Sequence, residues 1–132
     1  MKSFLAAVLG IISSIIVVYL GEMLAMLMFP IKEKIDPTDI EAIREMIKHV
    51  PFLALITIII SHGLGMLIGS FVSFKIHQKS PMPVLVIFLF MLISTISNLA
   101  IIPHPLWFMI SDVGTIVLAS IFGWFYFFRE RN

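Results

Sequence analysis

Apolar runs of 20 or more residues alternate with short polar segments along the whole chain. A membrane-spanning helix needs about 20 mostly apolar residues, because the hydrocarbon layer is about 30 Å thick and a helix rises about 1.5 Å per residue. Prolines gather at the ends of the runs, where a missing N–H disturbs a helix least. The pattern predicts four spans in one domain, residues 1–132: they are residues 4–29, 52–74, 82–102 and 106–128.

The segments that connect these spans differ in length and pattern. Residues 75–81 and 103–105 are short, so each is expected to join two antiparallel neighbours. Residues 30–51 are longer and carry apolar residues at helical spacing, which predicts an amphipathic helix over about residues 37–49. Asp36 is expected as its N-cap and Pro37 at its first position. This helix fits the membrane surface as well as it fits a packed connector.

The composition makes lipid the expected solvent for most of the chain. Of the 132 residues, 60% are apolar and 13% are charged, and the mean hydropathy is +1.09. One small core could not bury this apolar excess. The first run is also longer than the roughly 7–15 apolar residues of a secretion signal, so we expect it to remain as a span. The expected fold class is all-α, an integral membrane four-helix bundle with a short amphipathic surface helix after the first span.

Charge and cysteine content limit the partners and sites that the chain can have. The net charge of +1 gives no reason to expect a nucleic acid. The absence of cysteine excludes disulfides and thiolate metal sites. The expected partners are therefore the lipid bilayer and either further copies of the chain or other membrane subunits, with no cofactor.

Lysine and arginine residues near the span ends predict the orientation in the membrane. The side that holds both termini has five of them, close to the spans, and the side of the first loop has four. Both termini are therefore expected on the cytoplasmic side of the inner membrane. The first group comprises Lys2, Lys75, Lys79, Arg129 and Arg131, and the second comprises Lys32, Lys34, Arg44 and Lys48.

Small residues recur at helical spacing on three of the spans. Helices associate in membranes largely through close packing of small side chains. The second span has the most regular stripe, so we expect it to be the most buried. Its stripe is Ser61, Gly65, Gly69 and Ser73, the first span offers Gly10, Ser14, Gly21 and Ala25, and the fourth offers Asp112, Thr115, Ala119 and Gly123.

Ionisable residues inside the spans lie at similar depths below the proline-marked boundary on the first-loop side. At the helical rise, Glu22 lies about 12 Å, His62 about 16 Å and Asp112 about 10 Å below it. A charged side chain in hydrocarbon costs about 2.5–3.5 kcal/mol on insertion scales, so such groups usually pair and face protein or water. His62 precedes Gly69 by about two turns, which points it toward another helix. The predicted polar layer comprises Glu22, His62, Ser94, Ser97, Asn98 and Asp112.

Three roles fit this layer. The side chains could be hydrogen-bonding glue between helices, or they could form a proton or cation pathway or a pocket for a small polar ligand. They could also form a catalytic metal site, but no HExxH or ExxH motif is present. We expect no catalytic residues and no metal site, and hence no enzyme.

The segment IPHPLWF, residues 102–108, lies at the mouth of the predicted layer. Two prolines stiffen the turn around His104, and Trp107 is typical of the membrane interface. His104 could be a solvated turn residue. Alternatively, it could act as an outer proton relay, or as a lid together with Trp107.

Two motifs carry a resemblance to other proteins. His62, Gly65 and Gly69 form HxxGxxxG, and residues 103–108 form PHPLWF. In these the chain resembles uncharacterised small four-span bacterial membrane proteins, which implies no activity. Small multidrug exporters are similar in having four helices and an acidic residue in the first, here Glu22. The long first loop and His62 depart from their pattern, and we do not adopt that assignment.

The functional expectation is a small polytopic membrane protein that handles protons, ions or transport through the polar layer. The alternative is a non-catalytic accessory or scaffolding subunit of a larger membrane complex, in which the same side chains lock helices together.

Overall fold

The computed structural model describes residues 1–30, 36 and 38–128. Within these residues all regular structure is helical, and four of the five helices are long and apolar enough to cross a membrane. This confirms the predicted all-α class. Pro37, Lys32, Lys34, Arg129 and Arg131, which the sequence-based expectations used, lie outside the described residues. The helices are α1 (Lys2–Met28), α2 (Ile40–Lys48), α3 (Phe52–Ile76), α4 (Met82–Ile101) and α5 (Leu106–Phe128).

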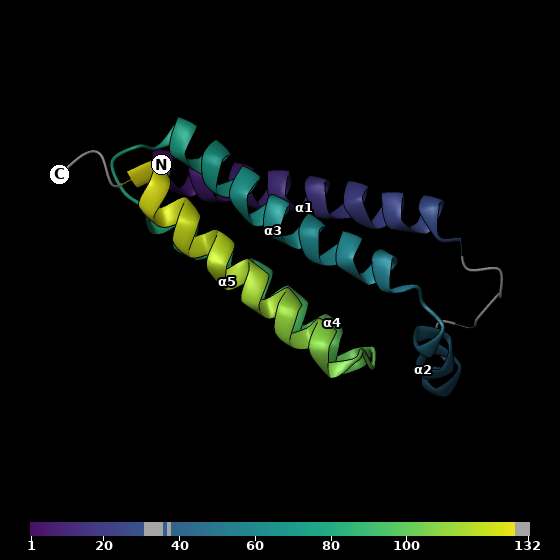
Figure 1. Cartoon of the computed structure of the whole chain (residues 1–132). Coiled ribbons are helices and arrows are strands. Elements are labelled where there is room, and N and C mark those ends of the chain that lie inside the picture. Colours follow the sequence, from purple (N-terminus) through teal and green to yellow (C-terminus); the bar gives the residue numbers. More distant parts are fainter. Residues whose placement is uncertain (31–35, 37, 129–132) are drawn as a thin grey trace.

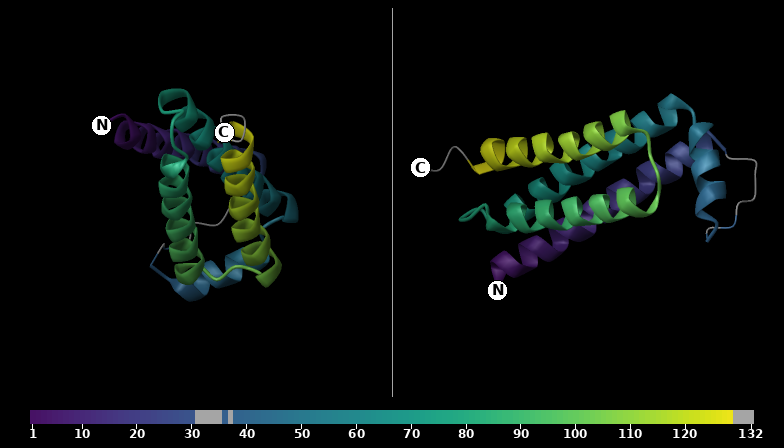
Figure 2. Two further views of the ribbon diagram at one scale, coloured as in Figure 1. Left: turned by 90° about the vertical axis from the view of Figure 1, so that its left-hand side faces the viewer. Right: turned by 90° about the horizontal axis from the view of Figure 1, so that it is seen from below.

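The four long helices form an up-and-down bundle with the short α2 at one end (Figure 1). The start of α1 and the end of α5 both lie at the opposite end, which we call the terminal end; the other is the α2 end (Figure 1). Figure 2 shows α4 and α5 side by side, and in its right-hand view α1 and α3 cross behind them.

α3 is the central helix, because it packs against α1, α4 and α5 and makes the two most extensive helix contacts, with α1 and with α5. Half of its most apolar stretch is buried (50%), against 22% for α1 and α4 and 33% for α5. The expectation that the second span is the most buried is therefore confirmed. The outer sides of α1 and α4 are correspondingly covered with exposed apolar side chains.

Small residues bring α1 and α3 into close contact. The Ser14 hydroxyl on α1 shares its one proton between the carbonyl oxygens of Gly65 on α3 (2.9 Å) and of Gly10 on its own helix (3.0 Å). A Cβ at Gly69 would lie 2.7 Å from the Gly10 carbonyl oxygen, so no larger residue fits there without movement. The two stripes predicted from the sequence thus meet each other within one chain.

α5 packs against the next face of α3. A Cβ at Gly63 would lie 2.7 Å from a methyl carbon of Thr115, and one at Gly123 would lie 2.8 Å from the hydroxyl of Ser70. Ser70 is fully buried, although the predicted stripe omits it. Ser73, which the stripe includes, is also fully buried, and its hydroxyl has no hydrogen-bond partner among the described residues.

The apolar core is divided into two clusters at different heights. On α3, His62 lies between Ile59 of one cluster and Met66 of the other, and on α5, Asp112 lies between Phe108 and Ile116. A polar layer therefore separates two apolar layers. The cluster toward the α2 end comprises Leu55, Ile59, Leu99 and Phe108, and that toward the terminal end comprises Met66, Val84, Ile87, Met91, Ile116 and Ala119.

α2 begins three residues later than the sequence suggested. Its N-cap is Asp39, whose carboxylate accepts from the Ala42 amide (3.0 Å), so the expectation of Asp36 as N-cap was wrong. Asp36 instead accepts from the amide (2.9 Å) and hydroxyl (2.7 Å) of Thr38, which closes a turn ahead of the helix. These two bonds to Thr38 lower the pKa of Asp36 from its ordinary 3.8. Both aspartates can cap a helix, and the local turn decides between them.

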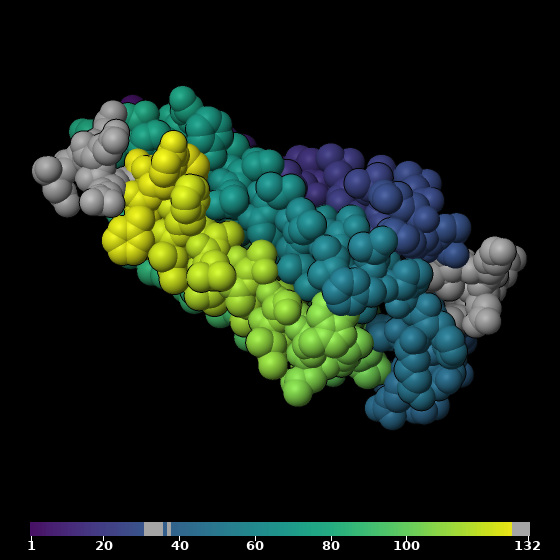
Figure 3. Space-filling view, viewed as in Figure 1, coloured from purple at the N-terminus to yellow at the C-terminus, as the bar shows by residue number. Residues whose placement is uncertain are grey.

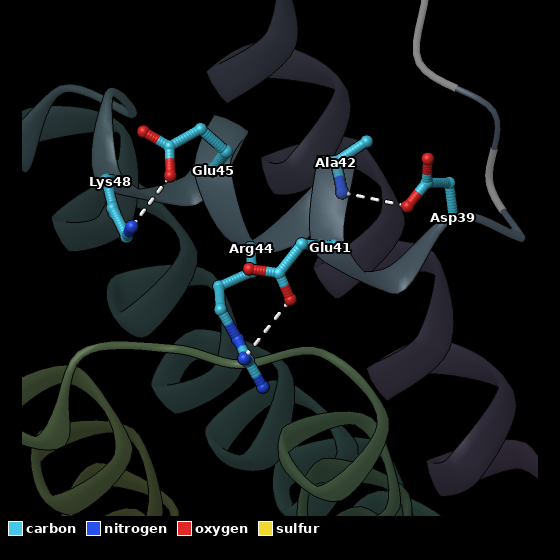
Figure 4. A network of polar contacts seen from close by, with 6 residues as sticks. All are labelled: Asp39, Glu41, Ala42, Arg44, Glu45 and Lys48. Atoms are coloured by element: carbon cyan, nitrogen blue, oxygen red, sulfur yellow. Dashed lines mark hydrogen bonds and ion pairs between the residues drawn. The ribbon is translucent and has the colours of Figure 1, made fainter.

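The amphipathic character of α2 is clear in the structure. Ile47 is buried, and the polar side carries the ion pairs Glu41–Arg44 (3.2 Å) and Glu45–Lys48 (2.6 Å) (Figure 4). Hydrogen bonding to Lys48, aided by its charge, lowers the pKa of Glu45 from 4.5. The helix runs across the bundle axis (Figure 2), and its side chains lie beside the start of α3 (Figure 3).

Candidate functional site

The centre of the candidate site is a hydrogen bond between α3 and α5. His62 Nδ1 lies 2.6 Å from Asp112 Oδ1, and the two side chains are only 8% and 1% exposed. α5 presents Asp112 one turn below the buried Phe108, so apolar residues cover the pair from the α2 end. Buried ionisable groups of this kind are stable only when they are paired.

This hydrogen bond determines which nitrogen of His62 is available. With Asp112 ionised, its carboxylate only accepts hydrogen bonds, so the proton of this bond belongs to Nδ1. In the neutral imidazole, Nε2 then has a free lone pair. Asp112 therefore orients the ring and leaves Nε2 as the basic atom.

Glu22 of α1 stands on the other side of the imidazole. Its Oε1 lies 3.9 Å from His62 Nε2, which is longer than a hydrogen bond and suits one bridging atom. The Glu22 side chain is 40% exposed, in contrast to Asp112. One imidazole is thus flanked by a buried carboxylate and by an accessible one, from three different helices.

Glu22 and His62 form part of the wall of an open cavity of about 400 Å³ between α1, α3 and α4. At the terminal end α1 contacts α4 closely, since a Cβ at Gly10 would collide with Ile87. Farther toward the α2 end the cavity separates the two helices. Its polar lining comprises Tyr19, Glu22, His62, Ser94, Thr95 and Asn98, and its apolar lining comprises Ile15, Val18, Phe90 and Met91.

The structure divides the predicted polar layer into two parts. Glu22, His62 and Asp112 form the row described above. Ser94 and Asn98 line the α4 wall of the cavity, and no hydrogen bond joins them to that row in the described part of the chain. Ser97 is exposed and does not line the cavity.

Sequence reasoning missed two polar residues of the cavity. Thr95 is buried and adjoins Ser94, but it is not ionisable, so its position alone did not distinguish it. Tyr19 precedes Glu22 by three residues and therefore shares its face of α1. Helical spacing from Glu22 is the signal that could have found it.

The predicted lid residues, His104 and Trp107, do not contact the polar row directly. His104 donates from Nδ1 to the carbonyl oxygen of Ile102 (2.7 Å), and its ring stacks on Phe108 with a centroid distance of 4.8 Å. Trp107 packs against Phe52 (4.9 Å). Phe108 thus lies between the turn and Asp112, and the described contacts of His104 and Trp107 do not reach the polar row.

The two carboxylates of the row lie against different atoms of one imidazole. Within the described part of the chain, no three His, Asp or Glu side chains converge so as to hold a metal ion. Glu22 and Asp112 approach different nitrogens of His62, on opposite sides of its ring. Comparison of the chain with family models, with curated proteins and with solved structures finds no match.

Proposed function

We propose that this protein is an integral inner-membrane protein that handles protons or ions through Glu22, His62 and Asp112. One observation carries the proposal: the imidazole is hydrogen-bonded at Nδ1 to a buried carboxylate, while Nε2 faces an accessible carboxylate on a cavity wall. Ionisable groups within spans most often mark ion pathways or proton relays.

The chemistry of one proton step follows from this geometry. A proton on Glu22 passes to a bridging water, and a proton of that water passes to His62 Nε2. The product is an imidazolium between two carboxylates, Asp112 at 2.6 Å and the newly ionised Glu22 at 3.9 Å. Both charges stabilise it in a surrounding of low dielectric constant. The reverse step returns the proton to the cavity.

Access to the row from a cavity supports the same function. The cavity between α1, α3 and α4 reaches Glu22 and His62, while Met66, Ile116 and other core residues pack between this row and the terminal end.

The alternative role is that of an accessory or scaffolding subunit. The burial and pairing of His62 and Asp112 favour it, because such a bond locks α3 to α5 whether or not protons move. The accessible Glu22 is not explained by that role.

Proton flux in proteoliposomes separates the two roles. The protein is reconstituted with an internal pH dye, and a pH step is applied in the presence of valinomycin. We expect flux above that of empty liposomes for wild type and for His104→Gln, and loss of flux for His62→Gln, with all variants monodisperse in detergent. Wild-type flux at the level of empty liposomes, or full flux in His62→Gln, would contradict the proposal and leave the scaffolding role.

The proposed topology has both termini in the cytoplasm and α2 on the outer surface. Lys2, Lys75 and Lys79 at the terminal end support it. Single cysteines at Ser3 and Lys79 should resist a membrane-impermeant thiol reagent in intact cells, whereas a cysteine at Glu41 should react. Labelling of the first two, with Glu41 protected, would reverse the orientation.

A further inference from the structure

We infer that the cavity between α1 and α4 binds a primary ammonium group, R–NH₃⁺, with Glu22 as its counter-ion. The inference deepens the proposed function and rests on it, since it names the ligand of the same Glu22 and His62. Three features carry it: the charge of the lining, the hydrogen-bonding capacity of the lining, and the size of the cavity.

The lining has a negative charge without a matching positive one. Among the described residues that form the wall there is one carboxylate, Glu22, and no lysine or arginine. The basic side chains of α2, at the end of the bundle, are paired with acidic ones, Arg44 with Glu41 and Lys48 with Glu45. With His62 neutral, the Glu22 charge attracts a cation into the cavity.

The lining is also rich in hydrogen-bond acceptors. His62 Nε2 has a free lone pair because Nδ1 donates to Asp112, and Glu22 only accepts when ionised. An atom that lies about 2 Å to the side of the line joining these two acceptors, which are 3.9 Å apart, can bond to both at about 2.8 Å. A primary ammonium has three N–H donors and no acceptor, so it can bond to both and to one hydroxyl or amide oxygen on the α4 wall.

Other cations match this site less well. A quaternary ammonium has no N–H, so it would leave the acceptors unpaired at a cost in affinity. Hard cations such as Mg²⁺ and Ca²⁺ prefer cages made of oxygen, whereas one of the two central acceptors here is the imidazole nitrogen of His62.

The size of the cavity indicates a ligand with a short organic part. Its volume of about 400 Å³ falls at the lower end of the range of about 300–1,000 Å³ for small-molecule sites. The rings of Tyr19 and Phe90 on the wall provide apolar contact and an attractive face for a cation. The group can come from a free amine or from the headgroup of an aminolipid, because both rings are also exposed at the outer surface of the bundle.

Equilibrium binding to the full chain tests the inference. The protein is placed in nanodiscs of phosphatidylcholine alone, and binding of [¹⁴C]methylammonium is measured by scintillation proximity. We expect saturable binding that ethylammonium displaces and that tetramethylammonium and K⁺ do not. Nanodiscs that contain phosphatidylethanolamine distinguish the sources: reduced binding indicates the lipid headgroup, and unchanged binding indicates the free amine.

Variants on the two walls of the cavity supply the controls. Glu22→Gln should weaken binding by about tenfold or more, since it removes the charge-assisted bond. Ser94→Val, on the opposite wall, should also weaken binding, and it serves as the test variant if Glu22→Gln fails to fold. Ser97→Ala, outside the cavity, should leave binding unchanged. Absence of saturable binding in both lipid compositions, equal displacement by tetramethylammonium, or unchanged binding in folded Glu22→Gln would overturn the inference.

The binding experiment and the flux measurement can refute their two proposals separately. Saturable methylammonium binding without proton flux would remove the proposed function and retain the binding site. Proton flux without methylammonium binding would retain the function and remove the ligand.

Discussion

Replacing Gly69 by alanine should separate α1 from α3. The added Cβ would collide with the Ser14 hydroxyl and would stand 2.7 Å from the carbonyl oxygen of Gly10, whereas ordinary contact begins at 3.4 Å, so the backbones must part by at least about 0.7 Å. A gap of about 0.5–1 Å forfeits a quarter to a half of the attraction between contacting atoms. The hydrogen bond from Ser14 to Gly65, now 2.9 Å, would lengthen beyond its useful range.

Together these losses should lower the free energy of unfolding by about 1–3 kcal/mol, the usual cost of overpacking. Gly114→Ala on α5 is the matched control, because a Cβ there would meet nothing within 4 Å. It should be neutral or stabilising, since alanine favours a helix over glycine by about 0.8–1 kcal/mol. Unfolding is followed by tryptophan fluorescence in mixed micelles of rising SDS content. If Gly69→Ala is as stable as wild type, or if both variants lose the same stability, the close-packing explanation is wrong.

Two further predictions concern the charged groups. Asp112→Leu should lower the free energy of unfolding by about 1–3 kcal/mol, because it leaves the buried Nδ1–H of His62 without an acceptor. Asp112→Asn keeps an acceptor and should cost less. The same SDS titration measures both variants, and equal losses would refute the role of the bond. Lys48→Ala should raise the pKa of Glu45 toward its ordinary 4.5 in a carboxyl NMR titration, while Arg44→Ala should leave it lowered. Because the pKa of Glu45 is lowered by Lys48, their pair is complete above about pH 4.5 and is lost as the pH falls through the lowered value.

The position of each element along the chain could be read from the sequence. Apolar runs, terminal prolines and helical spacing are local properties, and they predicted the four long helices and the all-α class. The start of α2 was missed because Asp36 and Asp39 are both good caps. The turn that Asp36 makes with Thr38 is a local alternative to capping, and composition does not rank the two.

Depth within the bundle was also predictable for the site. The rise per residue is fixed, so Glu22, His62 and Asp112 could be assigned to one layer before their contacts were known. Their proximity in the structure, 2.6 Å and 3.9 Å about one imidazole, agrees with that depth. Gly65 and Gly69 likewise indicated a close-packed face on α3.

Which helices meet, and which way each side chain turns, was decided only by the tertiary structure. A stripe of small residues says that something packs closely, but α1 was selected as partner by the fit of Ser14 and Gly10 against Gly65 and Gly69. Depth likewise left open which way Glu22 turns about the axis of its helix. The packing of four helices put Asp112 in the core and left Glu22 on a cavity wall, because α1 and α4 meet near Gly10 and are separated farther along. The difference between a buried carboxylate and an accessible one arises from that separation, which no single helix encodes.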